Sequence, residues 1–86
     1  MKVKDSFILR EVAGQNVVLP MDGDIDMNTM ITLNGTGAFL WERLQSDTSE
    51  DALVAALLAE YDVDEKRARE SVQRFIRTLE ENGFLE

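Results

Sequence analysis

Carboxylates and a single tyrosine are the side chains here that could act as general acids or bases, because the chain contains no histidine and no cysteine. Histidine is the commonest general base and metal ligand, and thiolates supply soft-metal sites and disulfides. A serine, threonine or lysine nucleophile would need an activating partner, and the sequence places none beside one. The composition therefore predicts a protein that is not an enzyme and that holds no cofactor.

The densest set of oxygen ligands is the run Asp22-Gly23-Asp24-Ile25-Asp26-Met27-Asn28. Its alternation resembles the start of a calcium-binding EF-hand loop, which requires glycine at the sixth position and a bidentate glutamate at the twelfth. Here those positions hold Met27 and Leu33, and the run lacks flanking helices. The prediction is a solvated acidic turn with no metal site.

The formal net charge is −8, and most of the acidic excess follows residue 33. Residues 34–86 carry six basic and twelve acidic side chains, and such a surface repels the nucleic-acid backbone. Two interpretations stay open for the basic cluster in the last predicted helix: a solvated face with pairs such as Lys66–Glu70 and Arg77–Glu81, or a nucleic-acid-binding surface. The cluster consists of Lys66, Arg67, Arg69, Arg74 and Arg77. Five acidic residues in the same helix balance it, so no nucleic-acid partner is predicted.

Hydrophobic periodicity divides the chain into a strand half and a helix half. Period-two alternation predicts strands at about 7–12, 16–20 and 28–33, the first two joined through Gly14. The period then becomes helical and predicts helices at about 36–45, 49–61 and 64–82. The buried face of the last helix is expected to carry Ala68, Val72, Phe75, Ile76 and Leu79. Eighty-six residues provide one small core. The prediction is a single α+β domain over 1–86, a three-stranded antiparallel sheet followed by three helices packed on one face.

Capping residues mark the predicted ends of the helices. The run Thr48-Ser49-Glu50-Asp51 supplies a hydroxyl cap with acids in the first turn, and Asp64 is a good cap for the last helix. Gly83 is expected to end that helix in a left-handed conformation. Phe84 and Leu85 are then expected to fold back onto the core.

The stretch Leu33–Trp41 is predicted to be the joint between the two halves. Asn34 suits a turn or cap that sets the angle between strand and helix, because asparagine bonds locally and tolerates left-handed backbone. Phe39 and Trp41 at helical spacing are expected to be core aromatics.

The strand that enters this joint is a candidate edge for pairing with another chain. Unpaired edge groups accept a further strand unless proline or lysine blocks them, and Thr29–Leu33 contains neither. The added strand can come from a peptide or from a second copy, so a strand-exchanged homodimer is a candidate assembly.

Three stretches carry a family resemblance over roughly residues 7–86: LNGTGAFLWERL, TSEDALVAALLAEYDVDEKRA and V-x-x-F-I-x-x-L-x-x-N-G-F-L. Their order and spacing resemble the PqqD-like family, named for a small protein of pyrroloquinoline quinone biosynthesis. The resemblance implies a winged-helix-like fold and a non-catalytic peptide chaperone. Such a chaperone is a recognition element for ribosomally made, modified peptides. It binds the leader of the precursor peptide and presents it to a modifying enzyme, often a radical S-adenosylmethionine (SAM) protein.

The resemblance also implies a site, in which the leader adds as a strand beside the third strand and lies against the third helix. Carried onto this sequence, the peptide-binding residues are Thr29, Met30, Ile31, Thr32 and Leu33 on the strand, and Arg69, Val72, Gln73 and Ile76 on the helix. An arginine at position 69 would suit acidic leader residues. The alternative function within the same fold class is a winged-helix nucleic-acid-binding or transcription-related protein.

No apolar segment approaches the roughly 20 residues that span a bilayer, and no apolar signal region follows Met1. The expected localisation is cytoplasmic, with no membrane partner.

Overall fold

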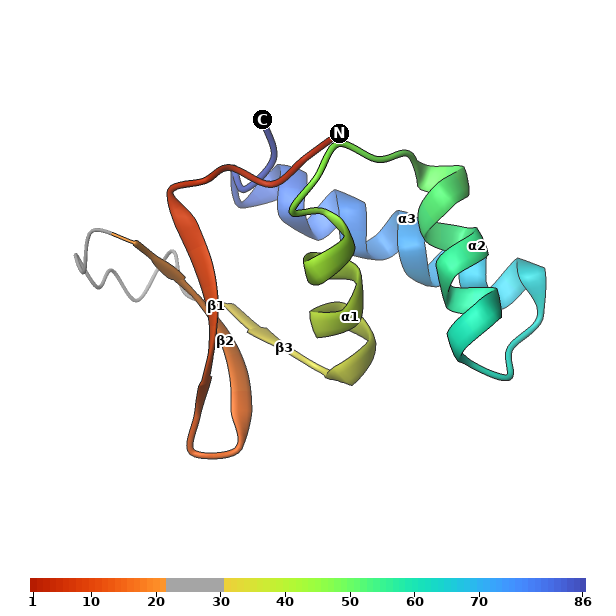
Figure 1. Cartoon of the computed structure of the whole chain (residues 1–86), viewed down its shortest axis with the longest axis horizontal. Helices are drawn as coiled ribbons and strands as arrows, with labels where there is room; N and C mark the ends of the chain where they lie inside the picture. Colours follow the sequence, from red (N-terminus) through yellow and green to blue (C-terminus); the bar gives the residue numbers. More distant parts are fainter. Residues whose placement is uncertain (22–30) are drawn as a thin grey trace.

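A computed structural model describes residues 1–21 and 31–86, in which three strands precede three helices (Figure 1). The strands are β1 (Phe7–Val12), β2 (Gln15–Pro20) and β3 (Ile31–Leu33). The helices are α1 (Gly35–Arg43), α2 (Glu50–Glu60) and α3 (Glu65–Glu81). The α+β architecture and the element order are confirmed, with boundaries close to those expected. Residues 28–30 of the expected third strand and the acidic run 22–28 lie outside the described residues.

The sheet is antiparallel with the order β1-β2-β3, so β2 is central and β3 lies at an edge of the described sheet. β1 and β2 are joined by Ala13 and Gly14, both at positive φ (53° and 80°), as in a type I′ hairpin turn. Val18 faces Leu9 on one side and Ile31 on the other. Val18 belongs to the core, and Leu9 and Ile31 are partly buried and pack against it, so the helices cover this face of the sheet.

Each helix begins at a side-chain cap. Asn34 Oδ1 accepts from the Gly37 N–H at 2.8 Å, Ser49 Oγ from Ala52 at 3.1 Å, and Asp64 Oδ1 from Arg67 at 2.8 Å. A cap satisfies one of the backbone donors that the first helical turn leaves unpaired. The cap at Asn34 lies directly after β3 and holds the corner between sheet and α1.

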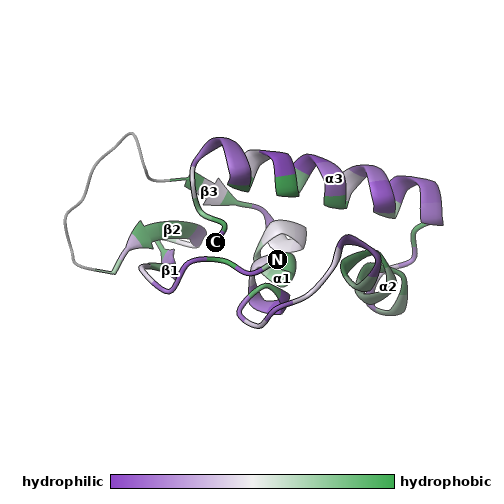
Figure 2. Cartoon of the chain, turned by 90° about the horizontal axis from the view of Figure 1, so that it is seen from above, coloured by the Kyte–Doolittle hydropathy of each residue, from purple (hydrophilic) through white to green (hydrophobic). Residues whose placement is uncertain are grey.

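The core lies where the sheet and the three helices meet (Figure 2). Trp41 is buried as expected, and its ring meets Phe84 edge to face at 6.0 Å between centroids. Phe39 differs from the expectation, because it is only half-buried, between the Tyr61 ring and the Arg43 guanidinium. The purple outer face of α3 in Figure 2 is hydrophilic, and its apolar residues face the other elements.

The end of α3 folds back as predicted. Gly83 has φ 73°, Phe84 N–H donates to Leu79 O at 2.9 Å, and Gly83 N–H donates to Glu80 O at 3.1 Å. These two bonds form a Schellman motif, in which a left-handed glycine reverses the chain. Phe84 becomes fully buried, and Leu85 pairs with Val3 near the start of the chain. Among the described residues, no helix is long and apolar enough to cross a membrane.

Candidate functional site

A groove of about 300 Å³ lies between β3 and α3, over the start of α1. Its walls come from β3, α1 and α3. β3 passes directly into α1 at this corner (Figure 1). The described lining residues are Thr32, Leu33, Asn34, Thr36, Gly37, Leu40, Ser71, Arg74, Phe75 and Thr78. Because β2 occupies one side of β3, the groove follows the side of β3 that faces α3.

Gly37 lets α1 approach β3 and α3 closely at the base of this groove. A Cβ on Gly37 would lie 3.2 Å from the Leu33 Cβ and 3.3 Å from Asn34 Oδ1, closer than side chains normally pack, and would touch Phe75 Cε1 at 3.4 Å. The glycine therefore leaves room beside Leu40 and Phe75, which give the groove an apolar base.

The α3 wall of the groove is one stripe of the helix. Ser71, Arg74 and Thr78 are spaced at i, i+3 and i+7, so they share a face, and Phe75 lies between this stripe and the core. Arg74 is the one charged side chain among the described lining residues, and it forms no ion pair with a described residue. The groove is therefore apolar at its base, with hydroxyls and one arginine at its rim.

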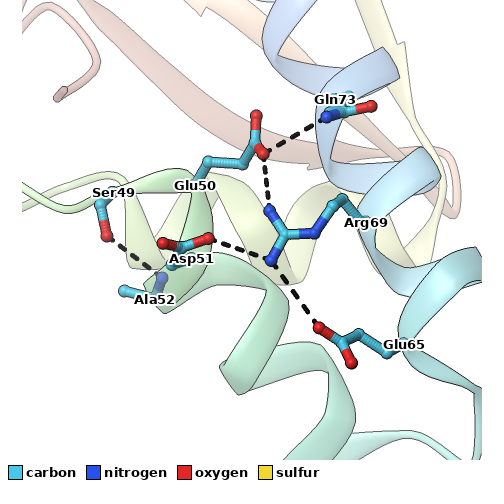
Figure 3. A network of polar contacts seen from close by, with 7 residues as sticks. All are labelled: Ser49, Glu50, Asp51, Ala52, Glu65, Arg69 and Gln73. Atoms are coloured by element: carbon cyan, nitrogen blue, oxygen red, sulfur yellow. Dashed lines mark hydrogen bonds and ion pairs between the residues drawn. The ribbon is translucent and has the colours of Figure 1, made fainter.

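The structure places the expected helix residues Arg69 and Gln73 elsewhere, on the α2 side of α3. The Arg69 guanidinium donates to Glu50 Oε2 at 2.7 Å and lies 3.0 Å from Asp51 Oδ1 (Figure 3). Gln73 Nε2 donates to the same Glu50 oxygen at 3.3 Å. The hydrogen bonds to Asp51 and Glu50 raise the pKa of Arg69 above its ordinary value. These two side chains therefore tie α3 to α2 and do not line the groove.

The other expected helix residues support the groove from the core. Val72 is fully buried, and Ile76 is half-buried against the core. A helix with a buried stripe has a rim on each side of it, and periodicity alone does not tell which rim meets β3. The residues on the β3 side carried a sequence signal of their own, since Ser71, Arg74 and Thr78 form an equally regular polar stripe.

On the strand, Thr32 and Leu33 reach the groove, with Thr32 exposed and Leu33 largely buried. Ile31 packs against the core. Thr29 and Met30 lie outside the described residues. The pairs Lys66–Glu70 and Arg77–Glu81 are not among the ion pairs of the described residues, so the outer face of α3 is exposed without them. No group of three described carboxylates could hold a metal ion.

Residues 15–85 match the family model described as Coenzyme PQQ synthesis protein D. The chain belongs to the PqqD family. The family predicted from the three sequence stretches is therefore confirmed. PqqD-family proteins are non-catalytic proteins that bind peptides, which agrees with a site that offers a strand edge and a groove.

Two solved structures share the fold of this PqqD-family chain. The first, TbiB1 in complex with the TbiA(beta) leader peptide, is 24% identical with a TM-score of 0.77, and the match covers 100% of this chain and 95% of that one. The second, a lasso peptide synthetase B1 complexed with the leader peptide, is 22% identical with a TM-score of 0.73, covering 96% and 93%. No curated protein matches the chain.

Proposed function

We propose that this protein binds the leader of a ribosomally made precursor peptide and presents the peptide to a modifying enzyme, a radical SAM protein. The observation that carries the proposal is the groove of about 300 Å³ between α3 and the side of β3 that no described strand occupies. Support comes from PqqD-family membership and from two proteins of the same fold, each solved with a leader peptide.

Strand addition explains how so small a groove can hold a peptide. The proposed pairing edge is Thr29–Leu33, of which the structure describes Ile31–Leu33 as β3. A leader that pairs with its backbone donors and acceptors gains affinity without any particular sequence. Every second side chain of the added strand would then point into the groove over Leu40 and Phe75. The fit of these side chains would fix the register in which the leader pairs with β3. The opposite wall of the proposed site is Ser71, Arg74, Phe75 and Thr78, because Arg69 and Gln73 are bonded to α2.

The test uses the precursor peptide encoded beside this protein's gene, titrated into the domain by isothermal calorimetry. Ser71→Trp places a bulky ring in the groove from an exposed position and should weaken binding at least tenfold without unfolding the domain. Glu70→Trp is the matched control, because position 70 is exposed on the same helix and lines no described cavity. It should bind like the parent.

Two further measurements test the two parts of the proposal, strand addition at β3 and delivery of the peptide to the enzyme. Hydrogen exchange at the outward-facing amide of β3 should slow when the peptide is bound, because that donor becomes paired. Modification of the precursor by the neighbouring radical SAM enzyme should require the parent domain and fail with Ser71→Trp. Peptide binding that Ser71→Trp leaves intact, with no new protection in residues 31–33, would place the site elsewhere.

A further inference from the structure

A second cavity continues the groove along α3, beyond the end of β3. It measures about 220 Å³, lies between the start of α1 and the α2–α3 connection, and shares Thr36 and Ser71 with the first. Its described lining residues are Thr36, Leu57, Tyr61, Val63, Arg67, Ala68 and Ser71. The two cavities therefore lie next to each other along a single stripe of α3, from Thr78 to Arg67, and this stretch of surface is called the path below.

This path is basic in an acidic protein. The charged side chains among its described lining residues are Arg67 and Arg74, while the whole chain has a net charge of −8. Neither arginine forms an ion pair with a described residue. Arg69, on the opposite rim, is surrounded by the carboxylates of Glu50 and Asp51. Both arginines of the path are therefore placed to pair with carboxylates of a bound ligand.

The spacing of the two arginines sets the spacing of their partners. Seven residues along an α-helix correspond to about 10 Å, and an extended peptide advances about 3.3 Å per residue. Two ligand carboxylates would thus be about three residues apart. Strict strand alternation is not required over this distance, because β3 ends at Leu33 and the peptide passes from the strand edge to the second cavity.

We infer that the path selects a leader segment with two acidic residues about three positions apart, one for Arg74 and one for Arg67, and an apolar residue for the second cavity. The apolar residue would contact Leu57, Tyr61 and Val63. Tyr61 and Val63 are 37% and 40% exposed, so this contact would cover apolar surface that is open to solvent in the free domain. The inference rests on the proposed function, since it names the class of peptide that the same groove takes.

The first experiment displays a library of random 12-residue peptides and selects it on the parent domain and on the Arg67→Glu/Arg74→Glu double variant. The parent should enrich peptides with Asp or Glu pairs two to four positions apart, and the double variant should not. Arg77→Glu is the control, because it reverses the charge at an exposed position of α3 that lines neither cavity. It should enrich the same peptides as the parent.

The second experiment measures the affinity of one enriched peptide for the parent domain and for the variants Arg67→Gln and Arg74→Gln. It also measures versions of that peptide in which Asn or Gln replaces one acidic residue. Each lost carboxylate should weaken binding roughly three- to tenfold at low salt and less at high salt. The loss should disappear when the matching arginine is already changed to Gln, which a double-mutant cycle detects. If Arg77→Glu weakened peptide binding as much, the overall charge of the domain would account for the affinity. That result would overturn the assignment of the carboxylates to Arg67 and Arg74.

The outcomes separate this inference from the proposed function. Enriched peptides that lack acidic pairs, bind the double variant equally well and are lost with Ser71→Trp would overturn the inference and leave leader binding intact. Failure of the precursor and of every library peptide to bind would overturn both. Displacement of the enriched peptide by a random DNA duplex at low salt, dependent on Arg67 and Arg74, would assign the path to nucleic acid instead.

Discussion

At the scale of single residues, Asn34 has two roles at one position. Its side-chain oxygen caps α1 by accepting from the Gly37 N–H at 2.8 Å, and the residue also lines the groove beside β3. The cap lies at the corner where β3 passes into α1, beside the groove. Sequence alone left open whether this asparagine is a turn or a cap residue.

Asn34→Ala should lower the free energy of unfolding by about 1 kcal/mol, the usual cost of losing a helix cap. Urea unfolding followed by circular dichroism measures the change. Asn34→Ser is the control, because serine keeps an oxygen in capping position and should stay within a few tenths of a kcal/mol of the parent. Equal stability of the alanine and parent domains would show that the cap contributes little.

At the scale of elements, α3 presents three different faces. Ala68, Val72 and Leu79 form the buried stripe that its periodicity predicts. On one side of this stripe, Arg69 and Gln73 bond to the start of α2. The other side, with Arg74, lines the groove toward β3. The sequence predicted these three buried positions, whereas the two rims differ only through what lies beside them in the folded chain.

Arg69→Met should lower the urea midpoint at low salt and have a smaller effect at high salt, because its ion pairs with Glu50 and Asp51 are partly exposed and are screened. Leader affinity should stay unchanged, since position 69 lies off the groove. Arg77→Met, without an ion pair to a described residue, is the control for loss of charge and should leave the midpoint nearly unchanged. A tenfold loss of leader affinity in Arg69→Met would show that Arg69 is part of the binding site after all.

At the scale of the whole molecule, the C-terminal residues close the core. Phe84 is fully buried and meets Phe7 of β1 at 4.5 Å and Trp41 of α1 at 6.0 Å between ring centroids. Lys4 N–H donates to Phe84 O at 2.8 Å, so the two ends of the chain lie together (Figure 1). Phe84 thus joins the sheet and α1 through its ring, and the start of the chain through its backbone carbonyl.

Phe84→Ala should lower the free energy of unfolding by about 3–5 kcal/mol, because it leaves a cavity among buried aromatics. That is a large share of the 5–15 kcal/mol or so that keeps small domains folded, so the thermal midpoint should fall steeply. Phe84→Leu keeps most of the apolar volume, so its free energy of unfolding should fall clearly less than that of the alanine variant. A loss below about 1 kcal/mol in the alanine variant would mean that the C-terminal segment is not part of the cooperative core.

The sequence by itself determined the element order, a serine or threonine cap before α2, the cap at Asp64, the fully buried positions of α3 and the family. It could do so because caps and periodicity depend on residues only a few positions apart. Only the tertiary structure decided which rim of α3 meets β3 and that two cavities join at Ser71. The rotation of a helix about its axis is set by packing against distant segments. Local patterns in the sequence do not record that packing, and so Arg74 lines the groove while Arg69 faces α2.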